Sequence, residues 1–395
     1  MLNTIEYEPR SYELRADPYP TYRALLAERP FHWNQTMDAY VAARHADCVR
    51  ILREPGWSVD RKRLAHKSTR PDAEMHHPLL GLLGLDPPDH TRLRTLVSKT
   101  FTPRMIERLR PRVEVLADEL LDGIARQRRV DFVKTFAFPL PVTVIAEMLG
   151  VPAADWEPFR HWSSVLAADL DPVPASGKRH NTLAAGRALF NYLGRVIAIR
   201  RKDPRDDLIS DLIAVEEAGD RLSEQELRTL CILLLVAGNE TSVGLLANGL
   251  LALLRNRTQL ERVRDDPSIA ESTVEELLRY DSPVQVTSRI AIQEQVIAGR
   301  VIAPGEEVFT LLGAANHDPE VFASPERLDV GRDPNPHLAF SRGLHFCLGA
   351  PLARLEGQVA MAMLLRRFPG LRLDGEPEWR MTLSLRGVTH LPLSV

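Results

Sequence analysis

The residues best suited to chemistry lie in one short segment, FSRGLHFCLG, which runs from Phe340 to Gly349. A helical pattern begins just after Cys347, so the free N–H groups and positive end of that helix would face the sulfur. Such surroundings lower the pKa of a thiol and favour the thiolate, the form that binds metals. Gly343 permits a backbone turn, and Gly349 lets a flat cofactor approach the main chain. The pattern predicts a metal-binding thiolate, shielded from water by Phe340 and Phe346, rather than an inert buried cysteine.

A second group of polar residues interrupts the most apolar stretch of the chain. The sequence AGNET (237–241) follows the run CILLLV within one long helical pattern, 223–255. Ala237, Gly238 and Thr241 share a helix face, and the Thr241 hydroxyl can hydrogen-bond to its own helix backbone and bend it. Glu240 is an unusual neighbour for such an apolar run and is a candidate for relaying protons through water. An acid and a hydroxyl in a buried helix favour a functional site over a solvated helix region.

Two pairs of charged residues also stand at helical spacing. Glu276 and Arg279 are three residues apart, and His90 and Arg94 are four apart, so each pair shares one helix face. Alone, such spacing usually gives a surface ion pair of little energetic value. Arg92 points away from the second pair and is expected to be an ordinary surface residue.

The composition excludes several classes of protein. With 50 Lys and Arg against 53 Asp and Glu, the net charge of −3 offers no basic excess for nucleic acid. Cys48, Cys231 and Cys347 are odd in number and far apart, which argues against a disulfide framework and a structural zinc site. No secretory signal precedes the first helix, and the longest unbroken apolar run (231–237) is far shorter than the ~20 residues that span a bilayer. We expect a cytoplasmic protein without a membrane anchor.

Helical patterns dominate the chain, and β patterns are short. The expected helices are 18–29, 45–54, 89–101, 103–126, 139–149, 153–169, 179–201, 206–218, 223–255, 257–264, 268–280 and 348–367. The expected β segments are 31–34, 39–43, 284–313 and 370–395. Ser223 and Glu226 predict a capping box at the start of the longest helix. No segment has the composition of a linker, so we expect one mainly α domain with minor β structure over 1–395.

The cysteine segment resembles the haem-binding signature of the cytochrome P450 family, F-x-x-G-x-H-x-C-x-G, at Phe340, Gly343, His345, Cys347 and Gly349. In that family the cysteine thiolate is the axial ligand of the haem iron and favours O–O cleavage. One departure is Ser341-Arg342, because many members have glycine directly after the phenylalanine. We expect this departure to affect the outer surface of the loop more than ligation. The resemblance covers about residues 15–395, with every motif in family order.

The resemblance also gives roles to the other motifs. AGNET is similar to the family's A-G-x-E/D-T, in which Ala237 and Gly238 leave room for haem and dioxygen while Glu240 and Thr241 organise the water that delivers protons. The family's E-x-x-R pair is matched by Glu276 and Arg279. It is joined there by an arginine before the cysteine, matched here by Arg332, in a structural network. The haem propionates would be held by four residues: His90, Arg94, Arg289 and His345.

The implied fold is the cytochrome P450 fold, with haem b between the long central helix and the cysteine loop and Cys347 on the iron. The implied activity is insertion of one oxygen atom of O2 into a lipophilic small molecule of the macrolide, polyketide, steroid, terpenoid or fatty acyl class. Since the chain carries no flavin or iron–sulfur domain, electrons would come from a ferredoxin and its reductase. The chain is similar to soluble bacterial members that hydroxylate macrolides or fatty acyl chains, and we expect a monomer.

The surroundings of the site are assigned more coarsely. The substrate pocket is expected to draw on residues 56–88, 165–182 and 284–286, on Leu234 and Ala237, and on the turn at 384–385. On the opposite, proximal side of the haem, Arg342 and Arg354 are expected to present positive charge to an acidic ferredoxin.

Three alternatives stay open. One is another haem-thiolate reaction, such as a peroxygenase, an oxidative coupling or a ring formation; the Glu240-Thr241 pair favours oxygen activation over these. A second is a non-catalytic haem binder or gas sensor, which the lack of a signalling domain argues against. The third is a structural or partner-binding protein without a cofactor.

Overall fold

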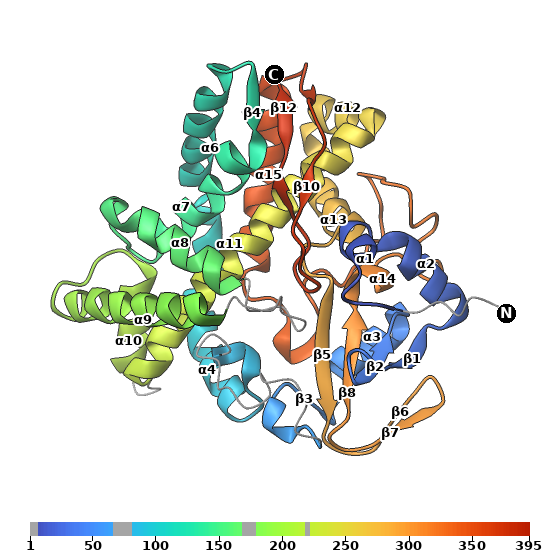
Figure 1. Ribbon diagram of the computed structural model, residues 1–395. Helices are drawn as coiled ribbons and strands as arrows, with labels where there is room; N and C mark the ends of the chain where they lie inside the picture. The colour runs from blue at the N-terminus through green and yellow to red at the C-terminus, as the bar shows by residue number, and fades with distance from the viewer. Residues whose placement is uncertain (1–6, 66–80, 168–178, 218–221) are drawn as a thin grey trace.

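The polypeptide forms a large helical part and a smaller β-rich part that pack against each other, as Figure 1 shows. The structure is a computed structural model that describes residues 7–65, 81–167, 179–217 and 222–395. Of the expected pocket segments, residues 66–80 and 168–178 lie outside these ranges.

The predicted helices are present in the predicted order, most of them to within a few residues, and the structure adds the short helices α1 and α14, which the sequence analysis missed. They are α1 (Tyr12–Ala16), α2 (Tyr19–Glu28), α3 (His45–Arg53), α4 (Asp89–Thr100), α5 (Pro103–Arg108), α6 (Arg110–Ala125), α7 (Pro139–Met148), α8 (Trp156–Ala167), α9 (Arg179–Lys202), α10 (Leu208–Glu217), α11 (Glu224–Arg255), α12 (Arg257–Asp265), α13 (Ala270–Tyr280), α14 (Leu312–Ala315) and α15 (Ala350–Arg367). Short 3-10 or π turns are η1 (Arg61–Arg63), η2 (Gly81–Gly84), η3 (Val133–Ala137), η4 (Ala153–Asp155), η6 (Pro267–Ile269) and η7 (Gly343–His345).

The prediction of one helix over 103–126 is wrong. The chain breaks at Leu109, between α5 and α6, and Pro111 occupies the first turn of α6. Proline has no N–H to donate and its ring clashes with the preceding turn, so it is tolerated at a helix start and not in a helix interior.

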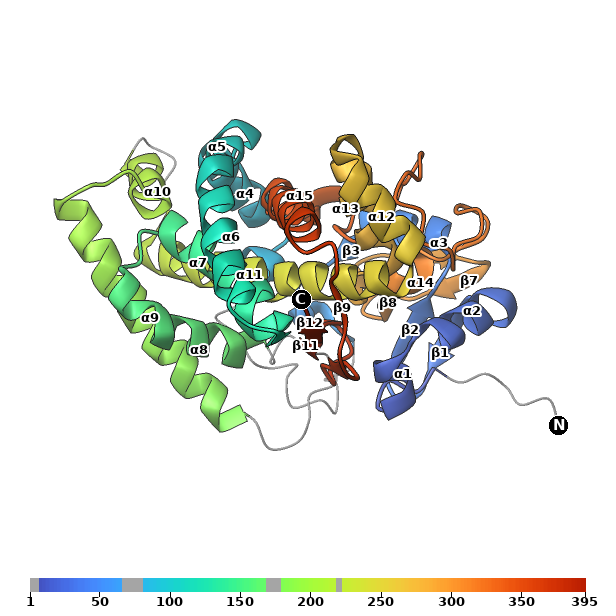
Figure 2. The same ribbon diagram turned by 90° about the horizontal axis from the view of Figure 1, so that it is seen from above.

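Helix α11 crosses the middle of the molecule, and α15 lies alongside it (Figure 2). The predicted capping box is present: the Ser223 N–H donates to Glu226 Oε2 at 2.7 Å, and the Glu226 N–H donates to Ser223 Oγ at 3.2 Å. Although its longest unbroken apolar run is short, α11 is long and apolar enough overall to cross a membrane. However, 83% of its most apolar window is buried inside the protein. Its apolar character is therefore accounted for by the core, as expected for a helix that is hydrophobic on all faces.

The β-rich part is built around a five-stranded sheet in the order β1-β2-β8-β5-β3. Strand β2 pairs with β8 in parallel, and the other neighbours are antiparallel. The strands of this sheet are β1 (Phe31–Asn34), β2 (Ala39–Ala42), β3 (Trp57–Ser58), β5 (Val286–Ala291) and β8 (Glu307–Leu311). It therefore joins strands from near the two ends of the chain and brings residue 289 of β5 toward the N-terminal half.

Three smaller sheets complete the fold. The C-terminal strand β12 (Pro392–Ser394) pairs with both β4 (Arg129–Asp131) and β9 (Arg372–Leu373). The pairs β6 (Gln295–Ile297) with β7 (Arg300–Ile302) and β10 (Glu378–Trp379) with β11 (Val388–His390) are antiparallel. Because β12 lies between strands distant in sequence, the last residues of the chain are part of the core.

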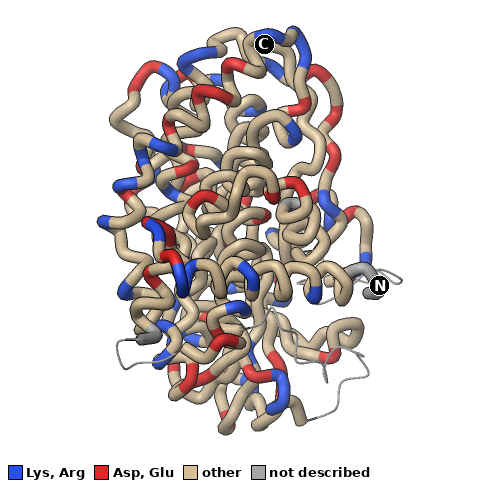
Figure 3. Tube along the Cα trace, turned by 90° about the vertical axis from the view of Figure 1, so that its left-hand side faces the viewer, with Lys and Arg blue, Asp and Glu red and all other residues tan. Residues whose placement is uncertain are grey.

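Charge is evenly mixed on the outside of the helical part. On the face shown in Figure 3, the left-hand side of Figure 1, Lys and Arg alternate with Asp and Glu along the described residues. This face offers no extended block of positive charge of the kind that binds nucleic acid.

Candidate active site

The cysteine loop is held in shape by its own backbone and by one helix beneath it. The Cys347 N–H donates to Phe340 O at 3.0 Å, which closes the loop on itself. Gly343 has φ +73°, and a Cβ there would lie 2.4 Å from Leu52 O at the end of α3. A side chain at residue 343 is therefore excluded by both backbone conformation and space. The rings of Phe340 and Phe346 stand edge to face with centroids 6.3 Å apart.

Cys347 directly precedes α15, whose N-cap is Gly349. The expected donors are present, because the backbone N–H groups of Gly349 and Ala350 lower the pKa of the Cys347 thiol. The expected net lowering is wrong, however: desolvation by burial is the larger effect and raises this pKa. A buried thiolate without a bound cation is costly, whereas a metal that binds the sulfur displaces its proton.

Ser341, the departure from the family signature, has φ +62°, a left-handed conformation that glycine adopts without strain. Its hydroxyl is buried and has no hydrogen-bond partner among the described residues. We therefore expect Ser341→Gly to raise the free energy of unfolding by about 1 kcal/mol, because it removes backbone strain and an unpaired hydroxyl. Thermal and denaturant unfolding of the two proteins would measure the gain. A lower stability of the glycine variant would contradict this account of the loop.

Four basic side chains gather at the cysteine loop from three parts of the sequence. His90 and Arg94 come from α4, Arg289 from β5 and His345 from η7. The rings of His90 and His345 have centroids 4.2 Å apart, and Arg94 donates to Phe346 O at 2.8 Å. Arg289 is 6% exposed, and within the described ranges its side chain donates to its neighbour, Ser288 O, at 2.7 Å.

This cluster has too few acceptors for its donors. Neither ring nitrogen of His90 has a partner, and none of the four side chains forms an ion pair in the described part of the chain. Burial lowers the pKa of Arg289 to about 10 and, together with nearby Arg289, that of His345 to about 3. Unpaired buried donors are costly, so the cluster fits a bound group that carries negative charge, such as the carboxylates of a haem.

One face of α11 remains open. Between Leu230 and Leu253 every residue is buried except Ala237, Gly238 and Thr241, the three that the sequence placed on one face. The Thr241 hydroxyl donates to Ala237 O at 2.6 Å, the backbone bond that was expected. Small side chains and one polar hydroxyl therefore line accessible space within an otherwise closed helix.

Glu240 has a partner that the sequence did not suggest. It is 6% exposed, and its Oε2 forms an ion pair with Arg380, which follows β10. Its Oε1 is buried and has no partner among the described residues. The acid is thus held by the C-terminal hairpin on one side and keeps one oxygen available for a further donor such as water.

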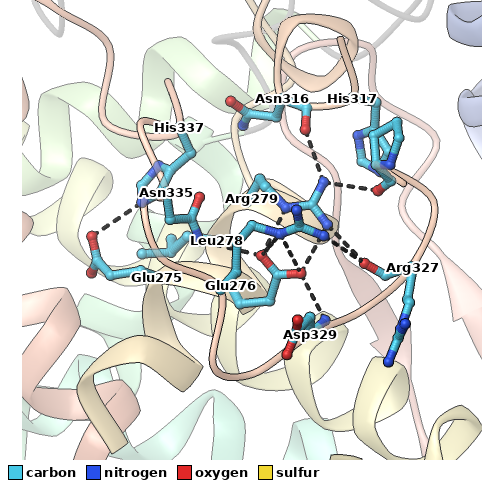
Figure 4. A network of polar contacts seen from close by, with 12 residues as sticks. Glu275, Glu276, Leu278, Arg279, Asn316, His317, Arg327, Asp329, Asn335 and His337 are labelled. Atoms are coloured by element: carbon cyan, nitrogen blue, oxygen red, sulfur yellow. Dashed lines mark hydrogen bonds and ion pairs between the residues drawn. The ribbon is translucent and has the colours of Figure 1, made fainter. Parts of the chain in front are cut away.

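Glu276 and Arg279 meet in one buried network (Figure 4), which Arg332 joins. Arg279 donates two bonds to the Glu276 carboxylate, at 2.7 and 2.9 Å, and both side chains are fully buried. Arg332 adds a bond to Glu276 Oε2 at 3.1 Å. Arg279 also donates to the backbone oxygens of Asn316, Pro325 and Arg327. The network thereby ties the irregular segment before the cysteine loop to α13.

A second buried network holds the hairpin that carries Arg380. Asp281 Oδ1 accepts from Tyr19 Oη and from Arg386 Nε, both at 2.7 Å. The Arg386 guanidinium also lies 3.7 Å from the ring centroid of Trp379. Sequence reasoning missed this network, since its members come from distant parts of the chain and share no spacing.

Glu356 is another residue that sequence reasoning missed, although a lone acid in the apolar pattern of α15 was a usable signal. It is 1% exposed, it hydrogen-bonds to Ser242 of α11, and burial raises its pKa to about 8. The folded protein therefore keeps a proton that the unfolded chain, with a pKa near 4.5, releases.

This difference predicts a pH dependence of stability. Between about pH 4.5 and 8 the folded state binds more protons than the unfolded state, so the contribution of Glu356 to stability falls as pH rises. We expect Glu356→Gln to gain stability over the unmodified protein as pH increases from 5 to 9. Unfolding curves across that range would measure the difference. A constant difference would show that Glu356 does not titrate in this way.

Comparison with known proteins places the chain in a family. The cytochrome P450 family model matches residues 166–382. The polyketide biosynthesis cytochrome P450 PksS of Bacillus subtilis is 38% identical over the full length of both chains, and its solved structure superposes with a TM-score of 0.90, covering 98% of this chain and 99% of that one. The 6-deoxyerythronolide B hydroxylase of Saccharopolyspora erythraea is 45% identical over 78% of this chain and 76% of its own.

A further solved structure is P450BioI in complex with hexadec-9Z-enoic acid ligated acyl carrier protein. It is 35% identical, covers 98% of this chain and 100% of that one, and has a TM-score of 0.90. The chain belongs to the cytochrome P450 family and has its fold, as the sequence predicted. It is a cytochrome P450 monooxygenase of the soluble bacterial type, and its cofactor is haem b with a cysteine thiolate as axial ligand.

Proposed function

We propose that Cys347 is the axial ligand of the haem iron and that the haem lies between the cysteine loop and α11. The observation that carries this proposal is the cluster of His90, Arg94, Arg289 and His345, buried or half-buried beside Cys347, whose side chains form no ion pair in the described part of the chain. Two propionates would supply the missing charge. The one face of α11 that is not closed by side chains supports the same placement.

When bound, the haem supplies activation of dioxygen and transfer of one oxygen atom to substrate, and the protein supplies orientation and control of water. Thr241 and Glu240 are the residues that we assign to proton delivery. Thr241 holds its hydroxyl toward the open face by donating to Ala237 O, so its oxygen remains able to accept from water. Glu240 Oε1 is buried without a partner and can accept from the same water, while Arg380 holds the other oxygen.

We expect Thr241→Ala to separate electron consumption from product formation. Without the hydroxyl, the water that delivers protons is no longer fixed, so less product and more hydrogen peroxide should form per electron pair. Thr229→Ala, on the same helix but outside the open face, is the matched control and should keep the ratio of the unmodified protein. Fully coupled turnover by the Thr241 variant would remove Thr241 from this role.

The substrate is inferred to be a lipophilic small molecule of the macrolide, polyketide, steroid, terpenoid or fatty acyl class. Two relatives are named for polyketide biosynthesis and for hydroxylation of 6-deoxyerythronolide B, and a third is solved with an acyl chain on its carrier protein. Among the described pocket residues, Leu234 and Val286 are apolar, and Val284 bridges to Leu385 of the C-terminal hairpin. Apolar walls suit such ligands.

We further infer that electrons come from a ferredoxin with its reductase, that the protein works in the cytoplasm as a monomer, and that residues 1–395 form one domain. Arg342, beside the cysteine loop, is the residue that we propose for docking an acidic ferredoxin. Its side chain forms no ion pair among the described residues and is therefore available.

The decisive experiment combines a ligand screen with isotope labelling. Purified ferric protein would be titrated with lipophilic compounds until one shifts the haem absorbance, and that compound would then be turned over with ferredoxin, reductase and labelled O2. One labelled oxygen atom in the product is expected. Turnover that is efficient with peroxide and poor with ferredoxin would favour a peroxygenase. A product without added oxygen would favour coupling or ring formation.

A further inference from the structure

We propose that Glu275, Arg354 and His337 form a further charged network that positions the cysteine loop and sets the electrostatic potential at the Cys347 sulfur. These are positioning residues, since they contact the segments that flank the loop and none of them belongs to the open face of α11. The inference rests on Cys347 as the iron ligand, which is part of the proposed function.

The centre of the network is the Glu275 carboxylate, on the residue next to Glu276 in α13. Arg354 of α15 donates to it twice, from Nε to Oε1 at 2.7 Å and from Nη2 to Oε2 at 2.8 Å. Such a two-bond pair fixes the guanidinium plane as well as its position. These bonds lower the pKa of Glu275 to about 2 against the opposing effect of burial, so the pair is charged at neutral pH.

His337 completes the network and has an assignable tautomer. Its Nδ1 accepts the Ala339 N–H at 3.2 Å, so in the neutral ring the proton lies on Nε2. That nitrogen is 3.2 Å from Glu275 Oε2 and therefore donates to it (Figure 4). The Glu275 carboxylate thus accepts three hydrogen bonds from two segments that flank the loop.

Arg354 connects this network to the cysteine. Its guanidinium lies 4.7 Å from the ring centroid of Phe340, the first residue of the loop. The Phe340 carbonyl in turn accepts the Cys347 N–H at 3.0 Å. Arg354 also stands near the start of α15, the helix that follows Cys347, so its charge lies close to the loop that holds the sulfur. A fixed cation and its fixed counter-ion therefore lie behind the sulfur.

This placement differs from the role expected for Arg354 from the sequence. Two guanidinium nitrogens of Arg354 donate to Glu275, and the guanidinium lies over the ring of Phe340. Arg342, in contrast, has no ion-pair partner in the described ranges. We assign the potential at the sulfur to Arg354 and leave ferredoxin docking to Arg342.

The direction in which each variant shifts the reduction potential distinguishes an electrostatic role from structural support alone. Reduction of the iron adds negative charge, so a nearby cation favours the reduced state and a nearby anion opposes it. Glu275→Gln removes the anion and should raise the reduction potential. Arg354→Gln removes the cation and should lower it. A loss of packing alone would not give opposite signs from two partners in one pair.

The test uses haem-loaded protein and four variants: Glu275→Gln, Arg354→Gln, Arg354→Lys and Arg342→Gln. Reduction potentials and ferrous–carbon monoxide spectra are expected to shift in opposite directions for the first two and to return toward the unmodified protein for Arg354→Lys. Arg342→Gln is expected to raise the KM for ferredoxin without moving the potential. Shifts of the same sign for Glu275→Gln and Arg354→Gln, or unchanged potentials in both, would overturn the inference. If the unmodified protein lacked the thiolate spectrum, the proposed function itself would have failed.

Discussion

Replacement of Arg279 by leucine is expected to lower the free energy of unfolding by about 3–5 kcal/mol, the range for breaking one side of a buried ion pair. Arg279 and Glu276 are both 0% exposed. The substitution would leave the Glu276 carboxylate buried with less compensation and would also remove donors to three backbone carbonyls in the segment before the cysteine loop. Both losses act on the folded state, so the effect should be among the largest of any single change.

Denaturant unfolding of the haem-loaded protein would measure this loss, together with the fraction of protein that retains haem. Arg112→Leu is the matched control, because Arg112 makes a two-bond pair with Glu147 that is exposed to solvent. That pair should be worth less than about 1 kcal/mol. Equal losses from the two arginines would show that burial does not decide the value of these pairs.

Replacement of Cys347 by serine is expected to abolish the absorbance of the reduced carbon monoxide complex that is typical of thiolate ligation. The serine hydroxyl is a far weaker acid than a thiol and gives iron no soft, negatively charged ligand. The other features of the loop, including Gly343 and the bond from residue 347 to Phe340 O, are backbone features and should persist. The loss would therefore come from the sulfur and not from an unfolded loop.

Cys231, a buried cysteine in the long helix α11, offers a direct control. Cys231→Ser, in α11, makes the same chemical change at a residue that is 0% exposed and has no part in the cysteine loop. It should keep the thiolate spectrum. Retention of that spectrum in the Cys347 variant, or its loss in the Cys231 variant, would disprove the ligand assignment.

Much of the fold could be predicted from the sequence, because the residues that mark a helix and its ends lie close together in the sequence. The periodicity of α11 and the Ser223-Glu226 capping box depend on residues within a few positions of one another, and both were correctly anticipated. The single error among the long helices came from Pro111, whose effect depends on whether it falls inside a helix or at its start. Spacing alone does not settle that choice.

The same difference between local signals and partners distant in sequence is found at the site. Spacing correctly grouped Ala237, Gly238 and Thr241 on one face, and family order brought together Glu276, Arg279 and Arg332. It did not find Arg380 as the partner of Glu240, which is 140 residues away in sequence, or the Arg386–Asp281 pair. Long-range partners carry no periodic signal, so only the folded chain identifies them.

The sequence by itself determined the chemistry that is available: one cysteine in a turn that requires Gly343, followed by a helix start, and basic residues whose role came from the family resemblance. The tertiary structure decided the direction in which the pKa of the thiol moves and which charged partners hold the other groups. Burial raises the pKa of the Cys347 thiol where local helix geometry alone predicts a lower one, and Glu240 and Arg354 are each held by one distant partner of opposite charge. The physical reason is that desolvation and ion pairing depend on which segments the whole fold packs together, and local sequence specifies only what each segment can offer.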